Sequence, residues 1–191
     1  GGLTDVSSVI VRSNREPPLE KAASNNTAVQ YTTGTRHVSL IGQDSLVDES
    51  ELTGVDYEDN NCTQPGVAAC RTIQQAIDQA ADGDLIKIDQ GTYTDVVTVT
   101  QGLQTLTQTA YVDKSVTLQG GYDRNDWDES PPNHISHTTT IVPPQGRAFY
   151  VTGGITVTVD RLVMRDGDAT GLGGGPSDQD AGGAIYNAGA N

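Results

Sequence analysis

Short apolar runs with a period of two residues recur along this chain, and their recurrence limits the folds that it can adopt. Similar phrases return at loose intervals: Leu85–Ile88, Val116–Leu118, Thr140–Val142 and Val157–Val159. Gly, Asp or Asn stands in nearly every gap between them, which favours tight turns. Because side chains alternate between the two faces of a strand, each phrase offers one small apolar row to a core. Such strands predict a sandwich, a barrel or a solenoid.

Three features of the strands favour the solenoid. Their apolar rows hold only two or three residues, fewer than a sandwich strand usually has. No Asn-Gly or Asp-Gly pair separates two matched strands, as the hairpins of an antiparallel meander would require. The phrases recur loosely, as solenoid repeats do when loops are inserted between them. We therefore expect an all-β solenoid.

One segment departs from this pattern and predicts a helix over residues 72–81. Four apolar residues share one helical face: Ile73, Ala76, Ile77 and Ala80. Thr72 and Gln75 form a capping box at its start, and Gly83 can take the left-handed conformation that ends it. The helix has a single apolar stripe, so we expect it to pack against the strands that follow.

The composition excludes several functions and favours export. The 11 Lys and Arg against 25 Asp and Glu give a net charge of −14, which suits neither a nucleic acid nor an anionic membrane surface. No apolar run approaches the roughly 20 residues of a membrane span. Low Lys with abundant Thr, Asn and Gly resembles secreted bacterial surface proteins. The sequence lacks an initiator Met and a signal peptide, so we expect a mature, processed form.

Cys62 and Cys70 are the only cysteines, and Gln64-Pro65-Gly66 between them is a turn signal. Two cysteines that close a small loop predict a disulfide in an oxidising compartment. Two free thiols are the main alternative. A zinc site is a weaker one, because it would need two further ligands and the three His lie far away in sequence.

Residues 70–88 resemble the amino-terminal entry of right-handed parallel β-helix proteins, where a capping helix precedes the first strand. Gly91–Tyr93 looks like the turn after that strand, and Ser115–Tyr122 looks like the next coil. Gly182–Asn187 resembles the glycine-led coil phrase of secreted bacterial β-helix repeat proteins. The resemblance, to pectate-lyase-like solenoids, covers roughly residues 60–191. It implies a right-handed parallel β-helix whose end is covered by the capping α-helix.

Residues 1–57 have no counterpart in that family. We expect them to form an extended amino-terminal arm, followed by the capping helix and the coils in residues 58–191. The arm contains strand-like runs: Val6–Val11, Ala28–Thr32 and Arg36–Ile41. No single apolar face links these runs, so the segment is either an arm with a few strands or a linker that a partner orders.

The family includes polysaccharide lyases and glycosidases, which raises the question of catalysis. Arg161 and Arg165 stand at period two on one expected strand face and could bind a carboxylated sugar. A solvated face with arginines paired to nearby Asp is the favoured alternative. Trp127, in a long insertion, could stack on a sugar, but we favour a role in anchoring that insertion. The Gly-His-Gly of polygalacturonases is absent, and no catalytic residue is predicted.

Ca²⁺ is the cofactor that the sequence suits best. Four carboxylates flank a glycine-rich loop: Asp166, Asp168, Asp178 and Asp180. Their spacing fits neither an EF-hand nor the RTX nonapeptide, so a solvated loop is the favoured interpretation. Gly171–Gly175 resembles a phosphate loop only superficially, because the Lys and helix that should follow are missing.

Two hypotheses about function remain. In the first, the chain is a non-catalytic structural subunit of an extracellular or cell-surface filament, built by head-to-tail contacts between copies and by strand exchange. In the second, it is the amino-terminal part of a secreted polysaccharide-binding or lyase-like protein. The sequence stops at Asn191 within a coil phrase, so either it is a fragment or another subunit covers that end. The first hypothesis is preferred because no convincing active site accompanies the fold.

Overall fold

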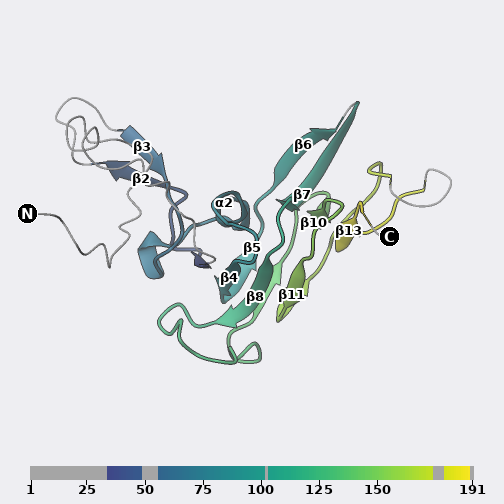
Figure 1. Cartoon of the computed structure of the whole chain (residues 1–191). Helices are drawn as coiled ribbons and strands as arrows, with labels where there is room; N and C mark the ends of the chain where they lie inside the picture. Colours follow the sequence, from purple (N-terminus) through teal and green to yellow (C-terminus); the bar gives the residue numbers. More distant parts are fainter. Residues whose placement is uncertain (1–33, 49–55, 102, 174–178, 190–191) are drawn as a thin grey trace, which may run out of the picture.

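The computed structural model describes residues 34–48, 56–101, 103–173 and 179–189 (Figure 1). Its regular secondary structure is almost entirely short strands, as expected for an all-β fold. Its single α-helix, α2 (Ile73–Asp78), follows a 3₁₀ turn, η1 (Gly66–Ala68). Within the same residues, no helix has the length and apolarity needed to cross a membrane.

Most of the strands belong to three parallel sheets. Sheet 1 contains β1 (Thr35–Val38), β4 (Leu85–Asp89), β8 (Thr117–Tyr122) and β11 (Thr158–Asp160). Sheet 2 contains β5 (Gly91–Tyr93), β9 (Thr139–Ile141) and β12 (Leu162–Met164). Sheet 3 contains β7 (Gln104–Val112), β10 (Arg147–Val151) and β13 (Ile185–Asn187). The chain visits sheets 1, 2 and 3 in that order three times, and we call these passages coils 1, 2 and 3.

The register between coils places similar residues in rows. Two examples are Ile86, Leu118 and Val159 in sheet 1, and Ala110, Phe149 and Ile185 in sheet 3. Buried residues from all three sheets and from α2 belong to one hydrophobic cluster. The three sheets therefore share a single core.

Two antiparallel ladders lie outside this repeat. β6 (Val97–Gln101) pairs with the first half of β7, and their hairpin projects from the sheets in Figure 1. β2 (Ser45–Asp48) pairs with β3 (Asp56–Asp59). The β6–β7 hairpin was not expected, because its turn carries neither an Asn-Gly nor an Asp-Gly pair.

The sheets begin earlier in the sequence than the expected boundary between residues 57 and 58. β1 pairs with β4 along its whole length, so the expected run Arg36–Ile41 has a partner within its own chain. The run Arg36–Ile41 therefore does not need another molecule to form a strand. The other two runs of the arm, Val6–Val11 and Ala28–Thr32, lie outside the described residues.

Candidate functional site

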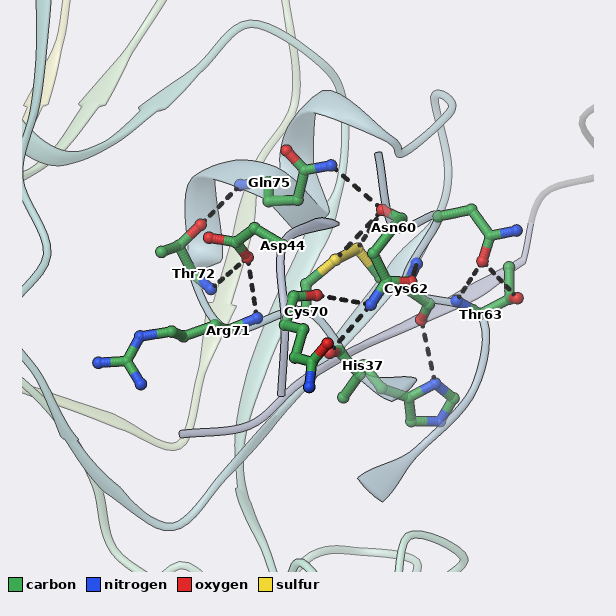
Figure 2. Close-up of a disulfide and its surroundings, with 12 residues drawn as sticks. His37, Asp44, Asn60, Cys62, Thr63, Cys70, Arg71, Thr72 and Gln75 are labelled. Atoms are coloured by element: carbon green, nitrogen blue, oxygen red, sulfur yellow. Dashed lines mark hydrogen bonds between the residues drawn. A yellow bond between two sulfur atoms is a disulfide. The ribbon is translucent and has the colours of Figure 1, made fainter. Parts of the chain in front are cut away.

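The loop that carries the two cysteines lies beside β1, the first strand of sheet 1. Figure 2 shows the disulfide and its surroundings. The predicted Cys62–Cys70 disulfide is confirmed, and both cysteines are fully buried. The His37 N–H donates to Cys62 O (2.7 Å), and His37 O accepts from the Cys70 N–H (2.9 Å). The Ser39 N–H donates to Cys70 O (2.8 Å). The backbone of the bonded cysteines thus occupies the outer edge of β1, where another strand would otherwise pair.

The side chain of buried Asn60 holds this loop in place. Its Nδ2 donates to three carbonyls, those of Gln43, Ala68 and Ala69, at 2.7–3.0 Å. Its Oδ1 accepts from the Cys62 N–H (3.0 Å). One amide side chain therefore binds backbone groups on both sides of the disulfide and ties the loop to the segment that contains Gln43.

The amino-terminal cap of α2 is shared between the helix and a distant residue. Thr72 Oγ1 accepts from the Gln75 N–H (3.2 Å), which is half of the predicted capping box. The Gln75 side chain instead donates to Asn60 O (3.1 Å). Asp44 replaces it, because Asp44 Oδ1 accepts from the N–H groups of Arg71 and Thr72, both at 2.9 Å (Figure 2).

Helix α2 is fastened to coil 1 along its length. Its predicted packing residues Ile73, Ala76 and Ile77 are buried, and so is Ala80, which lies just beyond the end of the helix at Asp78. The Gln74 amide exchanges two hydrogen bonds with the backbone of Tyr111 in β7 (2.7 and 3.2 Å), as a neighbouring strand would. Lys114 Nζ donates to the carbonyls of Ile77 and Asp78, near the negative end of the helix dipole. We call β1, α2 and the disulfide loop the closed end.

Replacing both Cys62 and Cys70 by serine is expected to lower the free energy of unfolding by about 2–3 kcal/mol, because the bridge restricts a short loop in the unfolded chain. Urea unfolding of the double variant measures the loss. Mass spectrometry of the unreduced protein should find the two linked peptides. Unchanged unfolding of the double variant would show that the bridge does not hold the closed end.

A polar row crosses the outer face of sheet 1. Its members are in register on four neighbouring strands: His37, Lys87, Gln119 and Asp160. Lys87 Nζ donates to Trp127 O (2.5 Å) and lies 4.9 Å from the ring centroid of Tyr122. Gln119 Nε2 donates to Asp160 Oδ2 (2.8 Å). These contacts link β4 to β8 and β8 to β11 across the outer face of sheet 1.

Trp127 attaches the long insertion between β8 and β9 to this row. Its ring stacks on Tyr122 with centroids 5.9 Å apart and meets His37 edge to face at 5.0 Å. Its Nε1 donates to Arg124 O (2.8 Å), and only 8% of the residue is exposed. These contacts support the anchoring interpretation, because little of the ring is left exposed for a sugar.

His37 carries a perturbed pKa within this contact. Burial is the largest cause and lowers the pKa of His37 below 6.5. The charges of Lys87 and Arg36 lower it further, while Cys62 O and Asp128 act in the opposite direction. The folded protein therefore favours neutral His37.

Stability is expected to fall as the pH drops below about 6.5, the value for an exposed His. Below that pH the unfolded chain binds a proton at His37 while the folded chain does not. The loss is complete once the folded form also titrates. Urea unfolding between pH 7.5 and pH 5 measures this slope. His37→Gln should reduce it, and His134→Gln, at an exposed position, should leave it unchanged. Equal slopes in all three proteins would contradict the role of His37.

The two candidate sugar-binding arginines do not share a strand face. Arg161 has a φ of +54° and forms the corner between β11 and β12. β12 contains neither Arg161 nor Arg165, so that expectation was wrong. Arg161 pairs with Asp160, as the alternative interpretation expected, and Arg165 is exposed.

Two of the candidate calcium ligands form hydrogen bonds within their own loops. Asp168 Oδ1 accepts from the N–H and hydroxyl of Thr170 (2.9 and 2.6 Å). Asp180 accepts from the N–H groups of Gly171 (2.9 Å) and Gly173 (2.8 Å). These hydrogen bonds lower the pKa of both carboxyls. Asp168 and Asp180 therefore stabilise the conformation of the loops in which they lie.

Only one of the other two candidate ligands lies among the described residues. Asp166 has a φ of +59°, and Asp178 lies outside the described residues. Among the residues that the structure describes, no group of three or more His, Cys, Asp and Glu is arranged to hold a metal ion. Ca²⁺ therefore has no structural support in this part of the chain.

Two buried acids, Asp84 and Asp89, were missed by sequence reasoning. Asp89 accepts from Ser39 Oγ (2.7 Å) and from the Tyr93 hydroxyl (2.5 Å), and it lies 3.5 Å from Arg124 Nε. Burial raises the pKa of Asp89, against the effect of these partners. The acid is fully enclosed, so it fixes the corner between sheets 1 and 2 rather than meeting a substrate. Asp84 directly precedes β4 and Asp89 ends it, and in sequence each resembles a solvated turn residue.

The opposite end of the sheets, which we call the open end, consists of β11, β12 and β13. Five of its apolar residues pack against the core but are only partly buried: Ile155, Val157, Val159, Leu162 and Met164. Ile185 is 37% exposed, whereas Val116 and Leu118 in coil 2 are 2% and 0% exposed. No described strand pairs with the outer edges of β11, β12 and β13.

Among the described residues, one end of the sheets is therefore covered by α2 and the disulfide loop, and the other is apolar with strand edges that have no described partner. No protein-family model matches the chain, and no curated protein or solved structure matches it significantly. The case for a function accordingly depends on the residues of this chain.

Proposed function

We propose that this chain is a non-catalytic structural subunit of an extracellular filament, built on a right-handed parallel β-helix. The repeated passage through three parallel sheets around one core supports the β-helix. Right-handed connections between parallel strands are the rule in proteins, which supports the handedness. The buried disulfide supports an oxidising compartment outside the cell.

The difference between the two ends is the observation that carries the proposal. At the closed end, the disulfide loop occupies the edge of β1 and α2 covers the core. At the open end, three strand edges lack a described partner and the apolar residues are partly exposed. Unpaired edges are templates for further strands, and apolar patches favour protein contacts. A contact between unlike ends does not close on itself, so it extends into a filament.

The arm is the proposed link between copies. Because the edge of β1 is already occupied, sheet 1 of one copy cannot continue directly into sheet 1 of the next. An extended segment can cross this junction by adding a strand to the open end. Residues 1–33 precede β1 at the closed end and contain two strand-like runs, Val6–Val11 and Ala28–Thr32.

The polysaccharide-related alternative has no specific observation in its favour. Trp127 is enclosed by Tyr122 and His37, and Arg161 is paired with Asp160. The proposed function is therefore assembly through contacts between the closed end of one copy and the open end of the next.

Deleting residues 1–33 is expected to abolish polymer formation and to leave the melting temperature of the body unchanged. The cut stops before β1, because a cut at residue 57 would remove a strand of sheet 1. Sedimentation velocity and negative-stain electron microscopy at about 0.15 M salt, which screens the net charge of −14, compare the two chains over a range of concentrations.

Equal polymerisation of both chains would exclude the arm as the link. A full chain that stays monomeric at high concentration would contradict the whole proposal.

A further inference from the structure

We infer that residues Val9–Arg12 of a neighbouring copy pair in parallel with Val157–Asp160, on the outer edge of β11. This inference rests on the proposed function. It names the segment that pairs with the open end and the register of that pairing. It predicts four neighbouring pairs: Val9 with Val157, Ile10 with Thr158, Val11 with Val159 and Arg12 with Asp160.

The segment that ends in β11 shows which residue types its partner must have. Ile155, Val157 and Val159 are partly buried, whereas Thr156 and Thr158 between them are exposed. Val159 pairs with Leu118 in coil 2, which is fully buried because a further strand lies over it. A strand that covers β11 in the same way must offer apolar side chains at period two, beside Val157 and Val159.

Residues 1–33 contain one such phrase. Val9 and Val11 are the only β-branched apolar residues in this range that stand two positions apart. Ser8, Ile10 and Arg12 would then lie on the outer face. In this register Val9 and Val11 would lie beside Val157 and Val159, and Arg12 would lie beside Asp160. Ile10 would lie beside Thr158, on the outer face.

Charge selects β11 over the other two edges and sets the direction of the strand. Asp160 ends the polar row of sheet 1, and its side chain is 36% exposed even with Arg161 as its partner. The residues on the corresponding face of β12 and β13, Val163 and Tyr186, carry no charge. In the parallel register Arg12 lies beside Asp160 and extends the row. In the antiparallel register Ser8 would lie there.

The arm is long enough to reach its own β11 as well as that of a neighbour. Residues 13–33 can span about 70 Å, and β11 lies about 14 Å from β1, three strand spacings away. A test must therefore separate exchange between copies from folding back within one chain.

Exchanging the charges of Arg12 and Asp160 distinguishes pairing between copies from pairing within one chain. Arg12→Glu alone and Asp160→Lys alone should each lower the mass of polymer at least tenfold, because each places like charges side by side. An equal mixture of the two variants should restore polymer, because each variant then meets the complementary charge on the other. The chain carrying both substitutions should polymerise like the unmodified protein. Arg15→Glu makes the same charge change outside the pairing segment and should have no effect.

The outcomes distinguish the register from the proposed function. If the unmodified chain polymerises but the mixture does not recover, the inferred pairing is wrong and the filament proposal stands. If the double variant recovers and the mixture does not, the arm binds its own chain, which overturns the pairing between copies. If the unmodified chain never polymerises, the proposed function itself fails.

Two substitutions in the arm test the pairing without touching the body of the protein. Val11→Asp would place a charge against Val159 and should abolish polymer. Ile10→Asp, on the outer face, should retain most of it. Equal effects of the two would contradict the inferred alternation. Melting temperatures of all variants confirm that the body, including the Asp160→Lys variant, remains folded.

Discussion

Ile77→Asp is expected to lower the free energy of unfolding by about 3–5 kcal/mol, because it would bury a charge without a partner. Ile77 is fully buried, and it belongs to the same cluster as core residues of all three sheets. A carboxylate there would lose its hydration and would also leave part of the core unfilled. Urea unfolding followed by circular dichroism measures the difference.

Val67→Asp is the matched control for this substitution. Val67 is an apolar residue of η1 that is 67% exposed, so the same chemical change should cost less than about 0.5 kcal/mol. Similar losses at the two positions would mean that α2 does not cover the core.

Asp84→Ala is expected to cost about 3–5 kcal/mol, because it would leave the buried guanidinium of Arg36 without its counter-ion. Asp84 Oδ2 lies 3.0 Å from Arg36 Nη2, and both side chains are buried. Asp84 also accepts from the N–H groups of Gly34 (2.6 Å) and Ala81 (3.0 Å). It therefore ties the start of β1 to the turn before β4.

A double-mutant cycle separates the ion pair from the backbone bonds. Arg36→Met combined with Asp84→Leu should be less destabilising than Asp84→Ala alone, because no unpaired charge remains. Arg161→Ala, which removes an exposed ion pair, should cost at most about 1 kcal/mol. An Asp84→Ala loss as small as that of Arg161→Ala would contradict the structural role of the buried pair.

Local features of the sequence predicted much of this fold. The period of Ile73 and Ile77 and the cap at Thr72 identified α2, because a helix repeats within a few residues. The alternating phrases identified β4, β8, β9 and β11 for the same reason. The first half of β7 was missed, because residues 104–109 are mostly Gln and Thr and lack an apolar alternation.

Features that depend on distant contacts could not be predicted. β1 looked like part of a free arm, because its partner β4 lies 50 positions further along the chain. Arg36 and Asp84 looked like surface charges, since nothing local shows that they meet in the interior. Asp44 gave no sign that it would help to cap a helix whose N-cap residue, Thr72, lies 28 positions later. In each case the partner is selected by the tertiary fold.

The two ends were predicted with unequal success. The cap-helix phrase identified the closed end, but the part played by Asn60 and by the cysteine backbone became evident only from the contacts around β1. The partial exposure of Val157 and Val159 could not be read from their sequence, which resembles that of the buried row Val116 and Leu118. Exposure depends on whether another strand lies over them.

X-ray fibre diffraction from aligned polymers of the full chain tests the central claim most directly. If copies join end to end, the strands of every coil stack along the filament axis at the spacing of neighbouring strands. End-to-end joining therefore predicts a reflection at about 4.8 Å on the meridian. Filaments in which that reflection lies on the equator, or a full chain that remains monomeric at every concentration tested, would contradict it.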